Sequence, residues 1–240
     1  MAALQTIEAG TLLVASAFPD PPFEVTQDGV DTGFDAELMR AVCGQIGLRW
    51  QLTKYEDDDF NGIFDGLRTR SYDAVASGTT ITPEREKVAL FSEPYLESGQ
   101  SLVVNTTLTP HIESTDDLAD QVVGIQTGNT SDTVARELKA DGKLAGIRYY
   151  PYHAILDALG DLEAGRIGGI MKLLPVATWL VKDRPDLDVV QEIDTHELLG
   201  IAFAPDNRGL RDAVNAALRT LRESGAIERL ERRWLVAPTA

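Results

Sequence analysis

The sequence predicts an α/β protein organised as two units, and three observations lead to this prediction. Short apolar runs alternate with segments whose apolar residues recur at helical spacing, as expected for repeated βα units with a largely parallel sheet. This alternation begins with "TLLVAS" and restarts at "VVGIQTG" after a polar, turn-rich stretch. The chain has 240 residues and is 43% hydrophobic, which is enough for one large domain or two smaller ones.

The first half of the chain reads as alternating strands and helices. In order, the strand-like and helix-like segments are "TLLVAS", "FDAELMRAVCGQIG", "RWQLTKY", "FNGIFDGLRTR" and "YDAVASG". The second segment contains Cys43, the only cysteine, so an internal disulfide is excluded.

The second half repeats this order and then returns to a strand. Its segments are "VVGIQTG", "SDTVARELKA", "IRYYPY", "HAILDALGDLEAG", "GGIMKLL" and "PVATWLVKD". Ser114 and Asp117 have the spacing of a helix capping box before this half begins. The apolar "LLGIAFAP" predicts a late return strand, and the amphipathic "GLRDAVNAALRTLRESGAIERLERRWL" predicts a terminal pair of helices.

The charge balance and the apolar runs exclude two classes of partner. The chain carries 22 Lys+Arg against 38 Asp+Glu, a net charge of -16, which argues against nucleic-acid binding. No run of roughly 18 apolar residues could span a bilayer. The N-terminus "MAALQTIEAGTLLV" lacks the layout of a signal peptide, which suits either a cytoplasmic protein or a secreted one without its leader.

No metal or cofactor site is predicted. His111, His153 and His196 are scattered, and none has the spacing of a metal ligand pair. The sequence contains no nucleophile elbow, P-loop or dinucleotide fingerprint.

Residues 77–85, "SGTTITPER", are the first candidate for ligand binding. They follow the strand-like "YDAVA", so their hydroxyls and main-chain N–H groups lie where open α/β sheets bind ligands. Arg85 can hold a carboxylate with two parallel hydrogen bonds. The alternative is a surface ion pair of Arg85 with Glu84 or Glu86.

Residues 127–132, "TGNTSD", are the second candidate. They follow the strand-like "VVGIQ" and open a helix, whose free N–H groups favour an anion. The alternative is that Asn129 and Thr130 only cap this helix. With one candidate in each unit, the pattern predicts that both contribute to binding a small anion.

These motifs resemble the bacterial extracellular solute-binding proteins of family 3, which deliver polar amino acids to ABC transporters. The resemblance is carried by "PPFEV", "GFDAELMRAV", "SGTTITPEREKVALFSEPY", "VVGIQTGNTS", "LEAGRIGGIMKLLPVA" and "LLGIAFAP". It implies a type II periplasmic-binding-protein clamshell of two lobes, with crossover strands near residues 97–103 and 198–203. Lobe 1 would then comprise residues 1–97 plus 200–240, and lobe 2 residues 98–199.

The resemblance also implies the ligand-binding residues. Arg85 and Thr80, with Ser77 and the main chain near Gly78, would hold the α-carboxylate of the ligand. From lobe 2, Asn129 and Thr130 would meet the same ligand, and Phe60 would form an aromatic wall.

The chain departs from the family pattern where the ligand's ammonium is expected. Leu173 occupies the position of a common aspartate, Asp20 that of a common aromatic residue, and Ala17 that of a common acid. Because an unpaired buried ammonium is costly, ordinary amino acids are expected to bind weakly. Two accounts remain open: Asp20 takes over the ammonium, or Lys172 faces the ligand and receives a second acidic group. A solvent-facing Lys172 is the alternative to the second account.

The resemblance therefore implies a non-catalytic, monomeric receptor that binds a small carboxylate and presents it to an ABC permease. Such a protein would be periplasmic or extracellular and lipid-anchored, with a leader segment that is not in this chain. The alternative function is a lyase of the same fold, similar to cyclohexadienyl dehydratases. Asp20 is the candidate acid for that chemistry.

Overall fold

A computed structural model describes residues 4–235, and the chain forms two compact units, each with its own mixed sheet. The first unit comprises the residues up to Glu56, Asn61–Glu97 and the residues from Leu198 onward. The second comprises Asp57–Phe60 and Ser98–Glu197. The predicted α/β class is confirmed.

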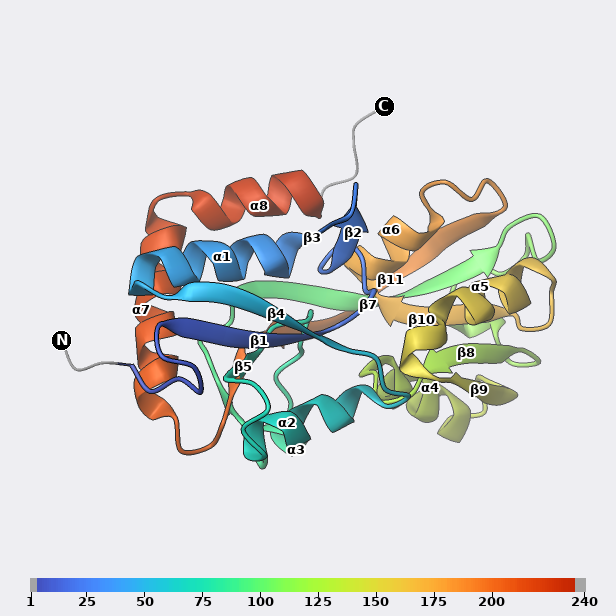
Figure 1. The fold of residues 1–240 in the computed structure, drawn as a ribbon. Helices are drawn as coiled ribbons and strands as arrows, with labels where there is room; N and C mark the ends of the chain where they lie inside the picture. Colours follow the sequence, from blue (N-terminus) through green and yellow to red (C-terminus); the bar gives the residue numbers. More distant parts are fainter. Residues whose placement is uncertain (1–3, 236–240) are drawn as a thin grey trace. The chain divides into compact units, whose positions relative to one another are not determined.

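The sheet of the first unit has the strand order β4-β1-β5-β12-β6 (Figure 1). Its parallel part consists of β4 (Arg49–Tyr55), β1 (Thr11–Ala17) and β5 (Ala74–Val75). The return strand β12 (Ala202–Phe203) lies antiparallel to both β5 and β6 (Leu90–Phe91). A separate hairpin contains β2 (Val25–Gln27) and β3 (Val30–Thr32). The sheet is therefore mixed rather than largely parallel.

Three longer helices belong to the first unit: α1 (Phe34–Ile46), α7 (Arg208–Glu223) and α8 (Ala226–Trp234). The last two are the predicted terminal pair, and α1 and α8 lie side by side (Figure 1). The buried residues of α7 include Leu210, Val214 and Leu218, which recur at helical spacing and so form one apolar face. Two short helices complete the unit: α2 (Asp65–Arg68), which follows a 3₁₀ helix, and α3 (Pro83–Glu86), which comes after β5.

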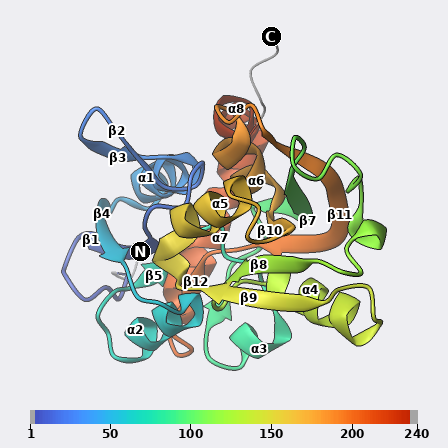
Figure 2. The same cartoon turned by 90° about the vertical axis from the view of Figure 1, so that its right-hand side faces the viewer.

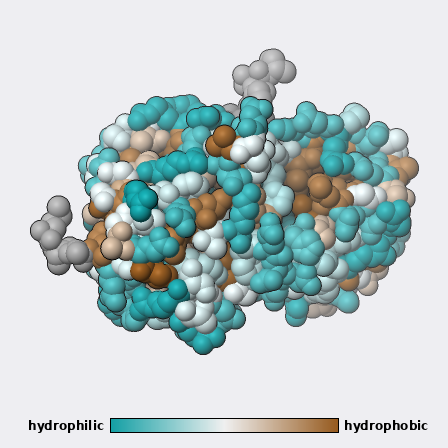
Figure 3. All heavy atoms as spheres, viewed as in Figure 1, coloured by the Kyte–Doolittle hydropathy of each residue, from teal (hydrophilic) through white to brown (hydrophobic). Residues whose placement is uncertain are grey.

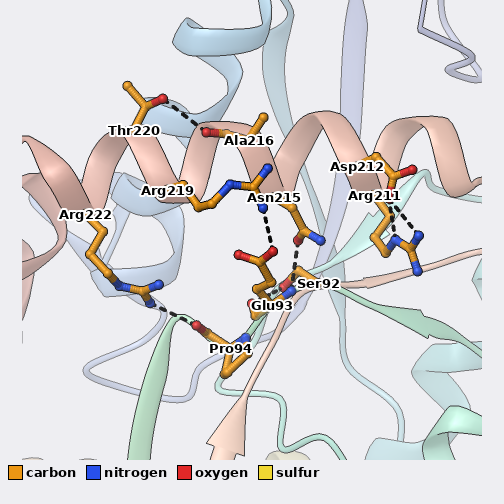
Figure 4. Close-up of polar contacts among 10 residues, drawn as sticks. All are labelled: Ser92, Glu93, Pro94, Arg211, Asp212, Asn215, Ala216, Arg219, Thr220 and Arg222. Carbon is orange, nitrogen blue, oxygen red and sulfur yellow. Dashed lines mark hydrogen bonds and ion pairs between the residues drawn. The ribbon is translucent and has the colours of Figure 1, made fainter.

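Polar contacts join α7 to Glu93 and Pro94, just before the chain enters β7 (Figure 4). Arg219 forms an ion pair with Glu93, whose main-chain N–H donates to Asn215 Oδ1 at 2.9 Å. Arg222 donates to the carbonyl oxygen of Pro94 at 2.9 Å. These contacts fix α7 against the segment that precedes β7 within the first unit.

The sheet of the second unit has the order β11-β7-β10-β8-β9 (Figure 2). Its strands are β7 (Leu96–Asn105), β8 (Val122–Gln126), β9 (Gly146–Tyr150), β10 (Gly169–Leu173) and β11 (Leu187–Leu199). Parallel pairing joins β9 to β8 and β8 to β10, whereas β7 pairs antiparallel with β10.

Helices of the second unit are α4 (Ser131–Ala140), α5 (Ile155–Glu163) and α6 (Leu174–Val181). The core contains two clusters: one includes Leu159 and Leu162 of α5, and the other includes Ala135 of α4. The predicted capping box is confirmed, because Ser114 and Asp117 make both reciprocal bonds at the 3₁₀ helix Thr115–Asp117.

The boundaries between the units fall inside β7 and β11, at Glu97–Ser98 and Glu197–Leu198. One further segment differs from the predicted division, because Asp57–Phe60 belongs to the second unit. The reason is backbone pairing: Tyr152 N donates to Asp58 O at 2.7 Å, and Phe60 N donates to Thr127 O at 3.2 Å. Phe60 therefore sits at the strand ends of the second unit, where the 3₁₀ helix Phe60–Phe64 begins.

Hydrophilic residues cover most of the face seen in Figure 3, and hydrophobic residues show in patches between them. Among residues 4–235, no helix is both long and apolar enough to cross a membrane.

Candidate functional site

Arg85 lies in the short helix α3, which begins after Thr82. The Thr82 side chain accepts a hydrogen bond from Arg85 N at 3.2 Å, and Pro83 takes the first helical position. Arg85 is only 7% exposed. Its Nη1 donates to Thr80 O at 2.9 Å and its Nε to Asn61 Oδ1 at 3.2 Å. This burial excludes the alternative of a solvated surface ion pair.

Internal hydrogen bonds fix the loop before Arg85. Gly78 has φ +51°, and a Cβ there would lie 2.8 Å from the ring of Phe23, so glycine is required at this position. Its N–H donates to Asp35 Oδ2 at 2.6 Å, and Ala17 N donates to Ser77 Oγ at 3.0 Å. The Gly78 N–H is therefore engaged by Asp35, and the expected contribution of the main chain near Gly78 to carboxylate binding stays a prediction.

Buried carboxyl groups surround this loop. Burial raises the pKa of the Asp35 carboxyl to about 7, while hydrogen bonds from Gly78 N–H and the Tyr95 hydroxyl oppose that rise. The charge of Asp20 adds to the increase, so the Asp20 carboxylate lies near enough to act on Asp35. Asp20 and Glu24 are themselves buried. The first unit thus holds a buried guanidinium and four buried acids, since Asp73 is buried as well.

Residues 198–200, where the chain returns to the first unit, pair with the same loop. Ile81 N donates to Leu198 O at 2.8 Å, and Gly200 N donates to Thr79 O at 3.0 Å. Thr80 and Leu199 form an antiparallel bridge between these bonds. Residues 198–200 therefore lie against the loop that holds Arg85.

An aromatic and cationic cluster lies in the second unit. The rings of Phe60 and Tyr152 have centroids 4.9 Å apart, and Lys172 Nζ is 4.9 Å from the centre of the Tyr152 ring. Lys172 is 2% exposed and Leu173 is 5% exposed. The alternative that Lys172 points to solvent is therefore wrong.

The loop before α4 is held by main-chain bonds. Asn129 N donates to Gln126 O at 3.1 Å, and Asp132 N donates to Asn129 O at 3.2 Å. Thr130 stands at the N-cap of α4, but its side chain makes no capping bond. Capping therefore does not account for the Thr130 hydroxyl.

The Thr130 hydroxyl instead belongs to a cluster around Glu197, which the sequence motifs did not indicate. It donates to Glu197 Oε2 at 2.8 Å, and Gln100 Nε2 donates to Glu197 Oε1 at 2.6 Å and to Thr130 Oγ1 at 3.1 Å. Thr195 Oγ1 adds a bond of 3.2 Å to Glu197 Oε1. While the bond to Glu197 is made, the single hydroxyl proton of Thr130 cannot go to a ligand carboxylate.

Within the described part of the chain, no group of three histidine, cysteine, aspartate or glutamate side chains could hold a metal ion.

The comparisons with known proteins agree on one family. A family model described as "Bacterial extracellular solute-binding proteins, family 3" matches residues 12–237. ABC transporter arginine-binding protein 1 of Escherichia coli is 30% identical over 220 residues, which are 89% of this chain and 86% of that protein. The L-cystine-binding protein TcyJ of Escherichia coli is 30% identical over 96% of this chain and 84% of its own length.

Solved structures agree with this result. An ancestral arginine-binding protein bound to arginine has a TM-score of 0.85 at 30% identity, over 95% of this chain and 99% of its own. An ancestral amino acid-binding protein, a precursor of cyclohexadienyl dehydratase, has a TM-score of 0.84 at 32% identity, over 95% and 96% of the two chains. The chain belongs to the bacterial extracellular solute-binding proteins, family 3, and has the two-lobed fold of its structural neighbours.

Proposed function

We propose that this protein is the receptor of an ABC importer and binds a small carboxylate-bearing solute of the amino-acid class through Arg85. The main support for the proposal is the buried guanidinium of Arg85, at the end of a βα unit. This group donates hydrogen bonds to Thr80 O and Asn61 Oδ1. A fixed, desolvated guanidinium suits a carboxylate because it can donate two parallel hydrogen bonds. The names of the relatives, which are arginine- and cystine-binding proteins, support the amino-acid class.

In this proposal each unit has its own candidate binding residues. The binding residues are Ser77, Gly78, Thr80, Arg85 and Asp20 of the first unit, and Phe60, Asn129, Thr130, Lys172 and Leu173 of the second. Gly78 permits the shape of the loop, and its N–H donates to Asp35 Oδ2.

Lys172 determines the expected side-chain preference. Its ammonium is buried beside Tyr152, so a ligand with a cationic side chain would bring a like charge to this cluster. We therefore expect neutral or acidic solutes to be preferred over arginine, although arginine-binding proteins are among the relatives.

The receptor has no catalytic role in this proposal. It acts as a monomer outside the cytoplasmic membrane, and its ligand-bound form is recognised by an ABC permease. A lyase is the second candidate function, because one structural neighbour is a precursor of cyclohexadienyl dehydratase. In a lyase, the buried Asp20 would be the catalytic acid. Incubation with a hydroxylated cyclohexadienyl carboxylic acid, followed by absorbance of the aromatic product, tests that candidate.

The ligand can be identified directly. Purified protein is denatured, and the released small molecules are identified by mass spectrometry. Thermal shift with each common L-amino acid follows, because a ligand that binds the native state raises the melting temperature. A released amino acid or related carboxylate that raises the melting temperature supports the proposal. A released ligand without any acidic group contradicts it.

A further inference from the structure

We infer that the carboxyl group of Asp35 competes with a solute carboxylate for the main-chain N–H of Gly78, so that a proton on Asp35 strengthens solute binding. The inference rests on the proposed function and adds its regulation by pH. Asp35, Gly78 and Arg85 all belong to the first unit. Asp35 is a positioning residue in this inference, because it acts through the loop that holds Arg85.

Two consecutive N–H groups of the loop lead to the carboxyl group of Asp35. Gly78 N donates directly to Asp35 Oδ2 at 2.6 Å. Thr79 N donates to the hydroxyl oxygen of Tyr95, and this hydroxyl donates to the same Oδ2 at 2.9 Å. A hydrogen bond to an ionised acceptor is roughly twice as strong as one to a neutral acceptor. The charge on Asp35 therefore determines how strongly it holds both N–H groups.

A solute carboxylate bound by Arg85 would need donors of the same loop. Gly78 is two residues before Thr80, whose carbonyl oxygen accepts from Arg85 Nη1 at 2.9 Å. Gly78 has a single main-chain N–H, and a carboxylate at neutral pH only accepts hydrogen bonds. An ionised Asp35 keeps this N–H, whereas a protonated Asp35 holds it weakly and lets it turn to the solute. Protonation also removes a negative charge that would repel a second carboxylate.

The surroundings of Asp35 let it bind this proton near neutral pH. Asp35 is 0% exposed, and within residues 4–235 its Oδ1 has no hydrogen-bond partner, so an ionised Oδ1 is costly. Burial raises the pKa of Asp35 to about 7, although the bonds from Gly78 and Tyr95 lower it, and the charge of Asp20 raises it. Burial raises the pKa of Tyr95 well above its ordinary value, so its hydroxyl remains a donor.

The charged groups that act on this pair are acids. Asp20 acts on Asp35, and Glu24 acts on Tyr95. The elements packed against α1 carry cations with other partners: Arg233 of α8 with Glu37, Arg219 of α7 with Glu93, and Lys54 of β4 with Asp31. In the part of the chain that the structure describes, Asp35 is thus a buried acid that forms no ion pair with a cation.

The pH dependence of affinity tests the inference. Calorimetry measures binding of L-glutamate and L-glutamine between about pH 5.5 and about pH 8, where the carboxylates of both probes stay ionised. Asp35 is protonated below about pH 7, so affinity should be highest there and fall about fivefold or more as pH rises to 8. Titrations in buffers of different ionisation enthalpy should show proton uptake on binding at about pH 7.5.

Two variants separate the proton from the structure. Asp35→Asn has no charge to lose, so its affinity should be independent of pH. Tyr95→Phe keeps the ring that stacks on Phe34, with centroids 5.9 Å apart, but removes a donor that favours the ionised acid. The fall in affinity should therefore move to higher pH in Tyr95→Phe, and this shift decides the question should Asp35→Asn not fold by circular dichroism. Asp65→Asn, at an exposed position of α2, should keep the wild-type profile.

Nuclear magnetic resonance of the Gly78 amide, recorded without a probe, follows the same proton. Its resonance should shift with a midpoint near pH 7 in the wild-type protein and stay constant in Asp35→Asn. Three results would overturn the inference: pH-independent affinity without proton uptake, the wild-type pH profile in Asp35→Asn, or a Gly78 amide resonance that does not change with pH. Failure of the proposed function has a different signature. In that case neither probe binds at any pH and Arg85→Ala changes nothing, whereas the Gly78 amide still titrates.

Discussion

Two loops of this protein are built alike, but the buried charged side chains associated with them have opposite sign. Residues 77–85 and residues 127–130 each follow a buried strand, β5 and β8, and each leads into a helix. The first loop ends in a buried guanidinium, whereas the second is hydrogen-bonded to the buried carboxylate of Glu197.

The difference arises from residues that reach the loops from distant parts of the chain. Asp35, on α1, accepts a hydrogen bond from the N–H of Gly78, and in our proposal the Arg85 guanidinium is the anion partner of the first loop. Glu197, on β11, takes the hydroxyl proton of Thr130, so the second loop presents an acceptor. The strand-loop-helix pattern alone therefore does not determine whether a loop suits an anion or a cation.

The largest expected effect is on the first loop. Arg85→Ala should weaken binding of L-glutamate, or of the ligand released from the protein, by several kcal/mol, because a buried carboxylate would lose its charged partner. Isothermal titration calorimetry measures the change. Arg136→Ala is the control, since Arg136 is an exposed arginine paired with Asp132 on α4. If Arg85→Ala binds the ligand with unchanged affinity, this loop does not bind the ligand's carboxylate.

The second prediction concerns the acid that supports the first loop. The folded-state pKa of Asp35, about 7, lies above the ordinary 3.8, so the folded protein binds a proton that the unfolded chain releases between these values. The contribution of Asp35 to stability is therefore complete below about pH 4 and is lost as pH rises through about 7.

Denaturant unfolding at several pH values checks this sign. The free energy of unfolding of the wild-type protein should fall relative to that of Asp35→Asn by an amount on the order of a few kcal/mol between pH 4 and pH 8. Glu84→Gln, which changes an exposed glutamate, should show the wild-type dependence. A constant difference between wild type and Asp35→Asn across this range would contradict the shift.

The third prediction addresses the second unit. Lys172→Met keeps most of the side-chain volume but removes the buried ammonium, so the preference for L-glutamate over L-arginine should fall by about tenfold, or ~1.4 kcal/mol. Competition binding measures the ratio of the two affinities. Lys139→Met, at an exposed position of α4, serves as the control. If Lys172→Met leaves the ratio unchanged, Lys172 does not set the side-chain preference.

The smallest expected effect is at the start of α3. Thr82→Ala removes the side chain that accepts from Arg85 N, and loss of such a cap costs about 1 kcal/mol. Thermal unfolding of the ligand-free protein should show a melting temperature lowered by a few degrees. Thr133→Ala, at an exposed position in α4, should change it less. A melting temperature unaltered in Thr82→Ala would show that α3 is held by Pro83 and packing alone.

Much of the fold was predictable from local pattern. The helix α1, the terminal pair α7 and α8, and the capping box at Ser114 each depend on residues close together in the sequence. The return strand was predicted as one run, "LLGIAFAP", but β11 ends at Leu199 and β12 begins at Ala202. Between them, Gly200 donates its N–H to Thr79 O, so the break results from pairing with a distant loop.

The candidate site was predictable only where its residues form a motif. The motif of Arg85, a strand followed by a helix that begins with Pro83, can be read locally, and the carboxylate-binding role of Arg85 stays a prediction. Glu197 could not be found in this way, because it is 97 residues from Gln100 and 67 from Thr130 in the sequence. In "DTHELLG" nothing distinguishes it from its polar neighbours, although the structure buries it between the exposed residues His196 and Leu198.

The first unit is built from separate stretches of the chain, and this affects the order in which its parts are synthesised. The second unit, apart from Asp57–Phe60, is one continuous stretch, whereas β12 and α7 of the first unit follow it in the chain. A ribosome therefore completes residues 98–197 before the loop of Arg85 can meet residues 198–200 or α7 can reach Glu93. We expect the second unit to acquire its structure before the Arg85 loop is complete, because residues 198–200 and α7 follow residues 98–197 in the chain. In the proposed receptor, a ligand would therefore meet a complete Arg85 loop only after these later segments have joined the first unit.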